Sequence, residues 1–189
     1  MGYLPMKAKI NKVTIHLVEG DILTLLVHGL VLDSNVDLLL SDDLAQMAGG
    51  HVQRELFEIG YCDVGSAVIT SAGDLPFQKL IHAVGPRWGE GSERGKLMTT
   101  IQDSLHLAEQ HKLKSVAFPA ISTGKNGYPI ENCAHIMLEN IVDYTFEELR
   151  SLRTIYICLK DDLSLQIFKR EFTRQIESLR ANDEGQVRI

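Results

Sequence analysis

The chain has 189 residues, of which 44% are hydrophobic and 23% charged, and its formal net charge is −6. This length and composition fit one globular domain with a substantial core. The negative charge disfavours nucleic-acid binding as the main role, because such binding relies on clustered Lys and Arg, although a local basic patch stays open. The apolar runs are also shorter than the roughly 20 residues that cross a bilayer.

The cysteines and histidines do not have the spacing of a metal site. Cys62, Cys133 and Cys158 are odd in number, and no two are spaced as metal ligands. We therefore expect reduced thiols in an intracellular protein, nuclear or cytoplasmic, with Cys158 in the core. The seven histidines form no zinc-type spacing with a cysteine, so we expect neither a metal nor a cofactor.

Short strands and helices alternate along the first half of the chain. Period-two and apolar runs predict strands at residues 13–18, 28–32, 67–70 and 79–83. Ser41-Asp42-Asp43 has the character of an N-cap, and we expect a short helix from there to about Ala48 and another at residues 52–59. We expect residues 1–12 to be an extension before the domain.

The second half continues the alternation. We expect helices at residues 96–110, from residue 130 onward and at 165–179, with strands at 116–118 and 154–159. The alternating strands and helices of both halves predict one α/β domain over residues 13–180, followed by a polar tail at residues 181–189. Helices on both sides of a mixed, largely parallel sheet make this a three-layer α/β/α architecture.

The stretch Ser115–Pro129 combines a strand, a loop with two glycines and a helix. Gly124 and Gly127 allow backbone N–H groups to turn inward, and the following helix adds partial positive charge. The loop has neither the Walker pattern nor the Rossmann pattern. Taken alone, it is equally consistent with a phosphate-binding loop and with an ordinary strand-to-helix connection.

Two other polar loops also follow predicted strands, namely the Gly20–Asp21 turn and residues 33–35. Ligands of parallel sheets bind beyond the carboxyl ends of the strands. We therefore expect these loops and residues 122–128 to line one cleft.

The chain resembles the macrodomain family, which binds ADP-ribose, over residues 13–179. The resemblance rests on four motifs, which are Gly20-Asp21-Ile22, Val31–Asn35, Ile81–Trp88 and Ala117–Pro129. Residues 41–44 and 124–129 look more like the macro-histone subtype than the hydrolase subtype. The resemblance implies ADP-ribose or a mono-ADP-ribosylated protein as the partner.

The same resemblance implies a role for each motif residue. Asp21 and the Ile22 N–H would bind adenine, residues 122–128 would wrap the diphosphate, and Leu44 would lie near the phosphates. Tyr128 and Asn35 would lie at the distal ribose, or Asn35 would hold its loop. The expected ligand-binding residues are Asp21, Ile22, Asn35, Leu44, Ser122, Thr123, Gly124, Lys125, Asn126, Gly127 and Tyr128. Without the resemblance, a turn residue at Asp21, a turn at Asn35, helix-face burial at Leu44 and a core-capping Tyr128 are ordinary alternatives.

Departures from the family pattern bear on catalysis. Hydrolase-type members carry an Asn and an Asp where this chain has Leu32 and Ala45, so no residue is assigned to activate water. Asp42 or Asp43 is a conceivable substitute, but both fit helix capping better. Lys160 follows the last strand, where many relatives have an aromatic residue that stacks on adenine.

The sequence therefore predicts an ADP-ribose-binding module that reads mono-ADP-ribosylated protein or free ADP-ribose metabolites, without hydrolase activity. One alternative is a hydrolase of mono-ADP-ribosyl groups or O-acetyl-ADP-ribose, in which Asp33 or Asp43 would matter. Another is a scaffold that has lost ligand binding and serves as an interaction surface. Leu32 and Lys160 are its best support, and Asp42 and Asp43 would favour it if they filled the cleft.

Overall fold

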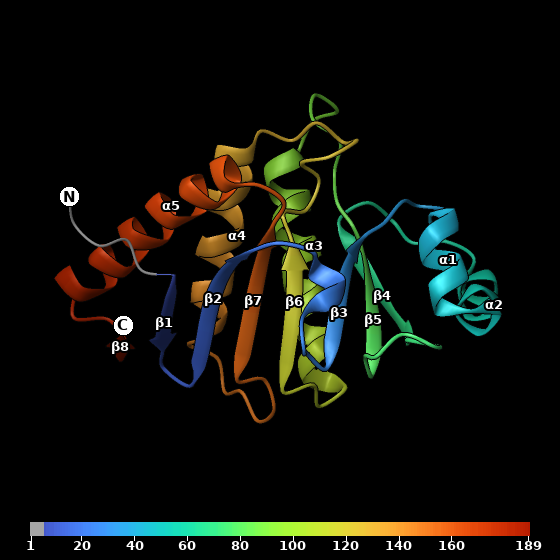
Figure 1. The fold of residues 1–189 in the computed structure, drawn as a ribbon. Coiled ribbons are helices and arrows are strands. Elements are labelled where there is room, and N and C mark those ends of the chain that lie inside the picture. The colour runs from blue at the N-terminus through green and yellow to red at the C-terminus, as the bar shows by residue number, and fades with distance from the viewer. Residues whose placement is uncertain (1–5) are drawn as a thin grey trace.

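The computed structural model describes residues 6–189, in which eight strands form one sheet (Figure 1). Their order across the sheet is β4-β5-β3-β6-β7-β2-β1-β8. The strands are β1 (Lys7–Ile10), β2 (Val13–Glu19), β3 (Gly29–Asp33), β4 (Ser66–Ser71), β5 (Lys79–Val84), β6 (Ser115–Pro119), β7 (Thr154–Leu159) and β8 (Val187–Arg188). The five central strands, from β5 to β2, run parallel. The outer pairs β4–β5, β2–β1 and β1–β8 are antiparallel.

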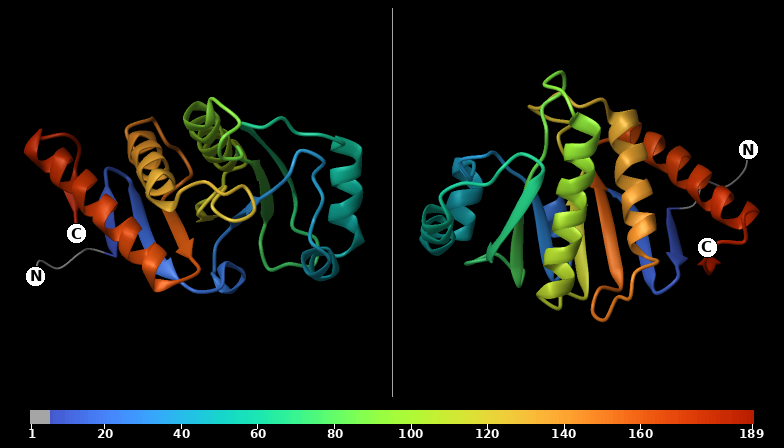
Figure 2. Two further views of the ribbon diagram at one scale, coloured as in Figure 1. Left: turned by 90° about the horizontal axis from the view of Figure 1, so that it is seen from above. Right: turned by 180° about the vertical axis from the view of Figure 1, so that it is seen from behind.

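Helices lie on both sides of this sheet. They are the 3-10 helix η1 (Ile22–Thr24) and the helices α1 (Asp42–Ala48), α2 (Gly50–Ile59), α3 (Glu93–Gln110), α4 (Ile130–Tyr144) and α5 (Asp162–Ala181). Figure 2 shows α3, α4 and α5 on one face and η1, α1 and α2 on the other side. The predicted three-layer α/β/α fold is therefore confirmed. Within residues 6–189, no helix is long and apolar enough to span a membrane.

Each face of the sheet has its own hydrophobic core. Alternate residues of β2 point to the larger core, which explains the period-two pattern of that strand. The larger core joins the sheet to α3, α4 and α5, with members such as Ile15, Phe118, Ile157, Leu105, Met137 and Phe168. The smaller core joins the opposite face to α1 and α2, with members such as Leu30, Leu80, Ala48, Val52 and Leu56.

The predicted elements are found in the structure, with two additions at the ends of the chain. Residues 7–10 were expected in an extension, yet they form β1, with Ala8 and Ile10 buried. Residues 187–188 were expected in a polar tail, yet they form β8 and pair with β1. The Asn11 side chain accepts a hydrogen bond from the Gln186 N–H at 3.0 Å and so fastens the two ends together. Residues 1–5 lie outside the described part, and the remaining domain boundaries stay a prediction.

The parallel strands bring their carboxyl ends to one edge of the sheet, at the top of Figure 1. The loops after β2, β3, β6 and β7 therefore start close together, as expected for a ligand-binding edge. Gly85, directly after β5, brings its loop against the loop after β6. A Cβ at Gly85 would overlap the Ser122 hydroxyl and lie 2.8 Å from the Ile121 side chain.

Candidate functional site

Two adjoining cavities, of about 630 and 400 Å³, open at the carboxyl edge of the sheet. Asp33, Gly124 and Lys160 line both, so the cavities form one continuous cleft. The larger cavity lies against the loop after β3 and the start of α1. The smaller one lies between the loop after β6 and the start of α5. Two of the three predicted loops thus line one cleft.

The loop after β6 offers backbone donors to this cleft. The Gly127 N–H donates to the Gly124 carbonyl at 3.0 Å, and Gly127 has a φ of 67°, which favours glycine. The N–H groups of Gly124, Lys125 and Asn126 have no hydrogen-bond acceptor within residues 6–189. Consecutive free N–H groups at a turn form a concave site for an anion.

Ser122, a predicted site residue, has its backbone N–H already bonded within the protein. Its side chain is fully buried beneath the cleft, and its φ is 66°. The Ser122 N–H donates to the Asp33 carboxylate at 2.9 Å, so it is not free for a phosphate. Contact with Gly85 on the other side explains why the sequence needs a glycine there.

Asp33 is the residue that the list of predicted ligand contacts missed. Asp33 lines both cavities and keeps contact with solvent there, while the protein around it still desolvates its carboxyl. Desolvation raises the pKa of Asp33 to about 6, against the opposing effects of the Ser122 N–H and the Lys160 charge. The sequence places Asp33 at the end of a strand in a loop expected to line the cleft, and only the hydrolase alternative gives its side chain a role.

Other predicted residues mainly brace the cleft. The Asn35 amide donates to the Leu39 carbonyl at 3.0 Å and accepts from the Leu39 N–H at 3.1 Å, which is the loop-holding alternative. The Asn126 amide donates to the Gly85 carbonyl at 3.2 Å. The Thr123 hydroxyl donates to the Ala120 carbonyl at 2.7 Å. Asn35 and Asn126 also line the larger cavity and Thr123 the smaller one.

Tyr128 is a buried side chain at the wall of the smaller cavity. It is 3% exposed, and the centre of its ring lies 5.1 Å from that of Trp88, edge to face. Tyr128 lines the smaller cavity, whereas Asn35 lines the larger one. The burial of Tyr128 fits the core-capping alternative, and its role at the distal ribose stays a prediction.

Asp21 and Ile22 border the cleft without lining either cavity. One Asp21 carboxylate oxygen accepts from the Leu23 N–H at 2.9 Å and caps η1. Ile22 packs against the smaller core. The turn lies close to the cleft, because the Cys158 thiol, which lines the smaller cavity, is 3.4 Å from the Gly20 carbonyl.

The departures from the family pattern fall on different sides of α1. Ser41 caps α1, while Asp42 and Asp43 lie in its first turn and line neither cavity of the cleft. Leu44 lines the larger cavity, whereas Ala45 faces a separate hollow.

Two lysines line the cleft. Lys160 follows β7 and lines both cavities, and Lys125 lines the larger one. The three cysteines are free and buried. Residues 6–189 hold no group of three or more His, Cys, Asp or Glu side chains that could bind a metal.

Comparison with known proteins gives relatives that match nearly their whole length. A macro domain-containing protein from Caldanaerobacter subterraneus is 34% identical and covers 85% of this chain and 97% of its own. An O-acetyl-ADP-ribose deacetylase from Escherichia coli is 33% identical and covers 87% of this chain and 98% of its own. These relatives are bacterial, so they give no support to the macro-histone subtype.

Solved structures show the same fold. The Oceanobacillus iheyensis macrodomain with ADP superposes with a TM-score of 0.85 at 28% identity, over 92% of this chain and 97% of that one. A mutant of the same macrodomain with ADP-ribose gives 0.82 at 28% identity, over 91% and 98%. The family model described as Macro domain matches residues 36–137. Together with relatives above 30% identity, this match shows that the chain belongs to the macro domain family.

Proposed function

We propose that this protein binds ADP-ribose across the two cavities of the cleft, as a reader of mono-ADP-ribosylated protein or of free ADP-ribose metabolites. The observation that carries the proposal is the run of three unpartnered N–H groups at Gly124, Lys125 and Asn126. Lys125 and Lys160 add positive charge beside them. Solved relatives of the same fold hold ADP or ADP-ribose.

The lining of the cleft supports a proposed order of contacts along it. The diphosphate lies at the Gly124 N–H, where the two cavities meet. The adenosine occupies the smaller cavity, near the Asp21 turn, and the stem of Lys160 covers part of the ring. The distal ribose occupies the larger cavity, between Asn35 and Leu44.

The proposal does not include hydrolysis. Leu32 lines the larger cavity where hydrolase-type members have an Asn, and Ala45 carries no carboxylate. Neither side chain can orient or deprotonate a water molecule.

A hydrolase of O-acetyl-ADP-ribose or mono-ADP-ribosyl groups is the second candidate. Two observations favour it, the name of the Escherichia coli relative and the carboxyl of Asp33 in the cleft, with a pKa of about 6. A carboxyl of that pKa is suited to proton transfer near neutral pH.

The scaffold alternative keeps Leu32 and Lys160 as its support, but Asp42 and Asp43, which would favour it by filling the cleft, line neither cavity.

Isothermal titration calorimetry with ADP-ribose, and with AMP as the smaller ligand, tests the proposal. We expect saturable binding that is tighter for ADP-ribose, weaker in Asp21→Ala and absent in Gly124→Glu, which places a carboxylate at the diphosphate. Gly95→Glu on α3 is the matched control, because it adds the same charge into open space away from the cleft. A folded wild type that gives no heat and no thermal shift would contradict the proposal. Turnover of a mono-ADP-ribosylated protein or of O-acetyl-ADP-ribose would favour the hydrolase.

A further inference from the structure

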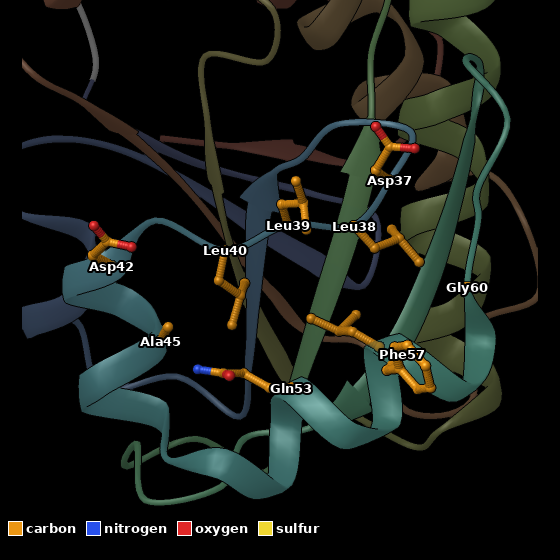
Figure 3. A pocket seen from close by; sticks show the side chains of 10 residues that line it. Asp37, Leu38, Leu39, Leu40, Asp42, Ala45, Gln53, Phe57 and Gly60 are labelled. Atoms are coloured by element: carbon orange, nitrogen blue, oxygen red, sulfur yellow. The ribbon is translucent and has the colours of Figure 1, made fainter.

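A third hollow, of about 410 Å³, continues the line of the cleft (Figure 3). Its walls are the segment 37–40, the start of α1 and one side of α2. Leu39 and Leu40 line both this hollow and the larger cavity. The smaller cavity, the larger cavity and this hollow, which we call the acceptor groove, therefore follow one another along the molecule.

The acceptor groove exposes large apolar side chains that a folded monomer would usually bury. Phe57 of α2 is 87% exposed and Leu39 is 69% exposed. Leu38 has a φ of 56°, which is a rare conformation for a bulky residue. This turn buries Leu38 in the smaller core and leaves Leu39 outside. Because Asn35 binds both backbone groups of Leu39, the exposed position is held by specific contacts.

Charge and backbone chemistry indicate what this groove fits. Among the described residues that line it, the charged ones are Asp37 and Asp42, and both are acidic. The N–H and the carbonyl of Leu40 have no hydrogen-bond partner within residues 6–189. Free backbone groups beside an apolar groove suit an extended polypeptide, and the carboxylates suit a cation on it.

We propose that the acceptor groove binds the polypeptide that carries the ADP-ribose, through an apolar side chain and a Lys or Arg near the modified residue. This inference rests on the proposed function. The modified side chain would be attached to the distal ribose in the larger cavity, and Leu39 and Leu40 form the wall between that cavity and the groove. The protein then distinguishes protein-linked ADP-ribose from the free metabolite and selects among modified sequences.

The test compares three probes by calorimetry. They are free ADP-ribose, a synthetic peptide that carries ADP-ribose between Leu and Lys residues, and the same peptide with Ser and Glu instead. We expect the Leu/Lys peptide to bind about tenfold more tightly than free ADP-ribose. Phe57→Gln and Asp37→Asn should abolish that preference and leave the affinity for free ADP-ribose unchanged. Leu26→Gln is the matched control, because Leu26 is 97% exposed outside the groove.

The outcomes separate the two proposals. Equal affinity for all three probes would overturn the inference and leave ADP-ribose binding intact. Failure of free ADP-ribose to bind would overturn both. Sedimentation analysis adds a further check. A wild-type dimer that Phe57→Gln dissociates, without any peptide preference, would assign the groove to self-association and overturn the inference.

Discussion

Replacement of Asp33 by Asn removes a negative charge from the centre of the cleft. Asn keeps the size of the side chain and an oxygen that accepts the hydrogen bond from the Ser122 N–H. If the diphosphate binds at the Gly124 N–H, the Asp33 carboxylate repels it. Two unit charges roughly 6 Å apart interact by about 3 kcal/mol at an effective dielectric constant of about 20. Lys160 opposes this repulsion and water enters the cleft, so we expect a net effect of about 1 kcal/mol, or about fivefold tighter binding.

The pH dependence of ADP-ribose binding should differ between wild type and Asp33→Asn. Because the pKa of Asp33 is about 6, wild type should bind ADP-ribose more tightly as the pH falls from about 8 to 5. Asp33→Asn should bind with little change over that range, and calorimetry at each pH measures the difference. The raised pKa also means that the stabilising contribution of protonated Asp33 is lost as the pH rises from 3.8 to about 6, and Asp33→Asn should lack this component of the pH dependence.

Asp43→Asn is the control for this experiment, because it removes the same charge outside the cleft. Weaker binding by Asp33→Asn at every pH would refute the repulsion and show that the carboxylate itself contacts the ligand.

Three further predictions concern stability, and chemical denaturation measures each. Gly85→Ala should lower the free energy of unfolding by about 1–3 kcal/mol, because the added Cβ overpacks against Ser122 and Ile121. Gly95→Ala, in open space on α3, should leave it unchanged or raise it. Equal effects of the two substitutions would contradict the close contact at Gly85. Burial lowers the pKa of His82 to about 4, so stability should fall by roughly 3 kcal/mol as the pH drops from 6.5 to 4, and His82→Gln should remove that component. Burial raises the pKa of Glu171, but hydrogen bonds from a neighbouring arginine, histidine and glutamine outweigh it and lower the pKa to about 2. Glu171→Gln should therefore cost about 1–2 kcal/mol at neutral pH and nothing below pH 2, and a constant cost would contradict this assignment.

Local periodicity was sufficient to predict most of the fold. The apolar run Thr154–Leu159 has the same bounds in the prediction and in the structure, because a strand buried between neighbours is apolar over its whole length. The short outer strands were missed for a physical reason. Lys7–Ile10 alternates over only four residues, and its pairing with Val187–Arg188 joins opposite ends of the chain. Local patterns carry no information on such contacts.

In the candidate site, too, local sequence predicted some features, whereas others depend on contacts between distant parts of the chain. The glycines of the loop after β6 indicated inward N–H groups, and the structure leaves those of Gly124, Lys125 and Asn126 unpartnered within residues 6–189. The Ser122 N–H binds the carboxylate of Asp33, 89 positions earlier in the chain, so the neighbours of Ser122 in sequence could not reveal this contact. Tyr128 likewise packs edge-on against Trp88, which belongs to another loop.

A crystal structure with ADP-ribose tests the central claim most directly. We predict the diphosphate against the N–H groups of Gly124, Lys125 and Asn126, with the distal ribose in the larger cavity beside Asn35. Density for ADP-ribose elsewhere on the protein, or an empty cleft at saturating ligand, would contradict the account.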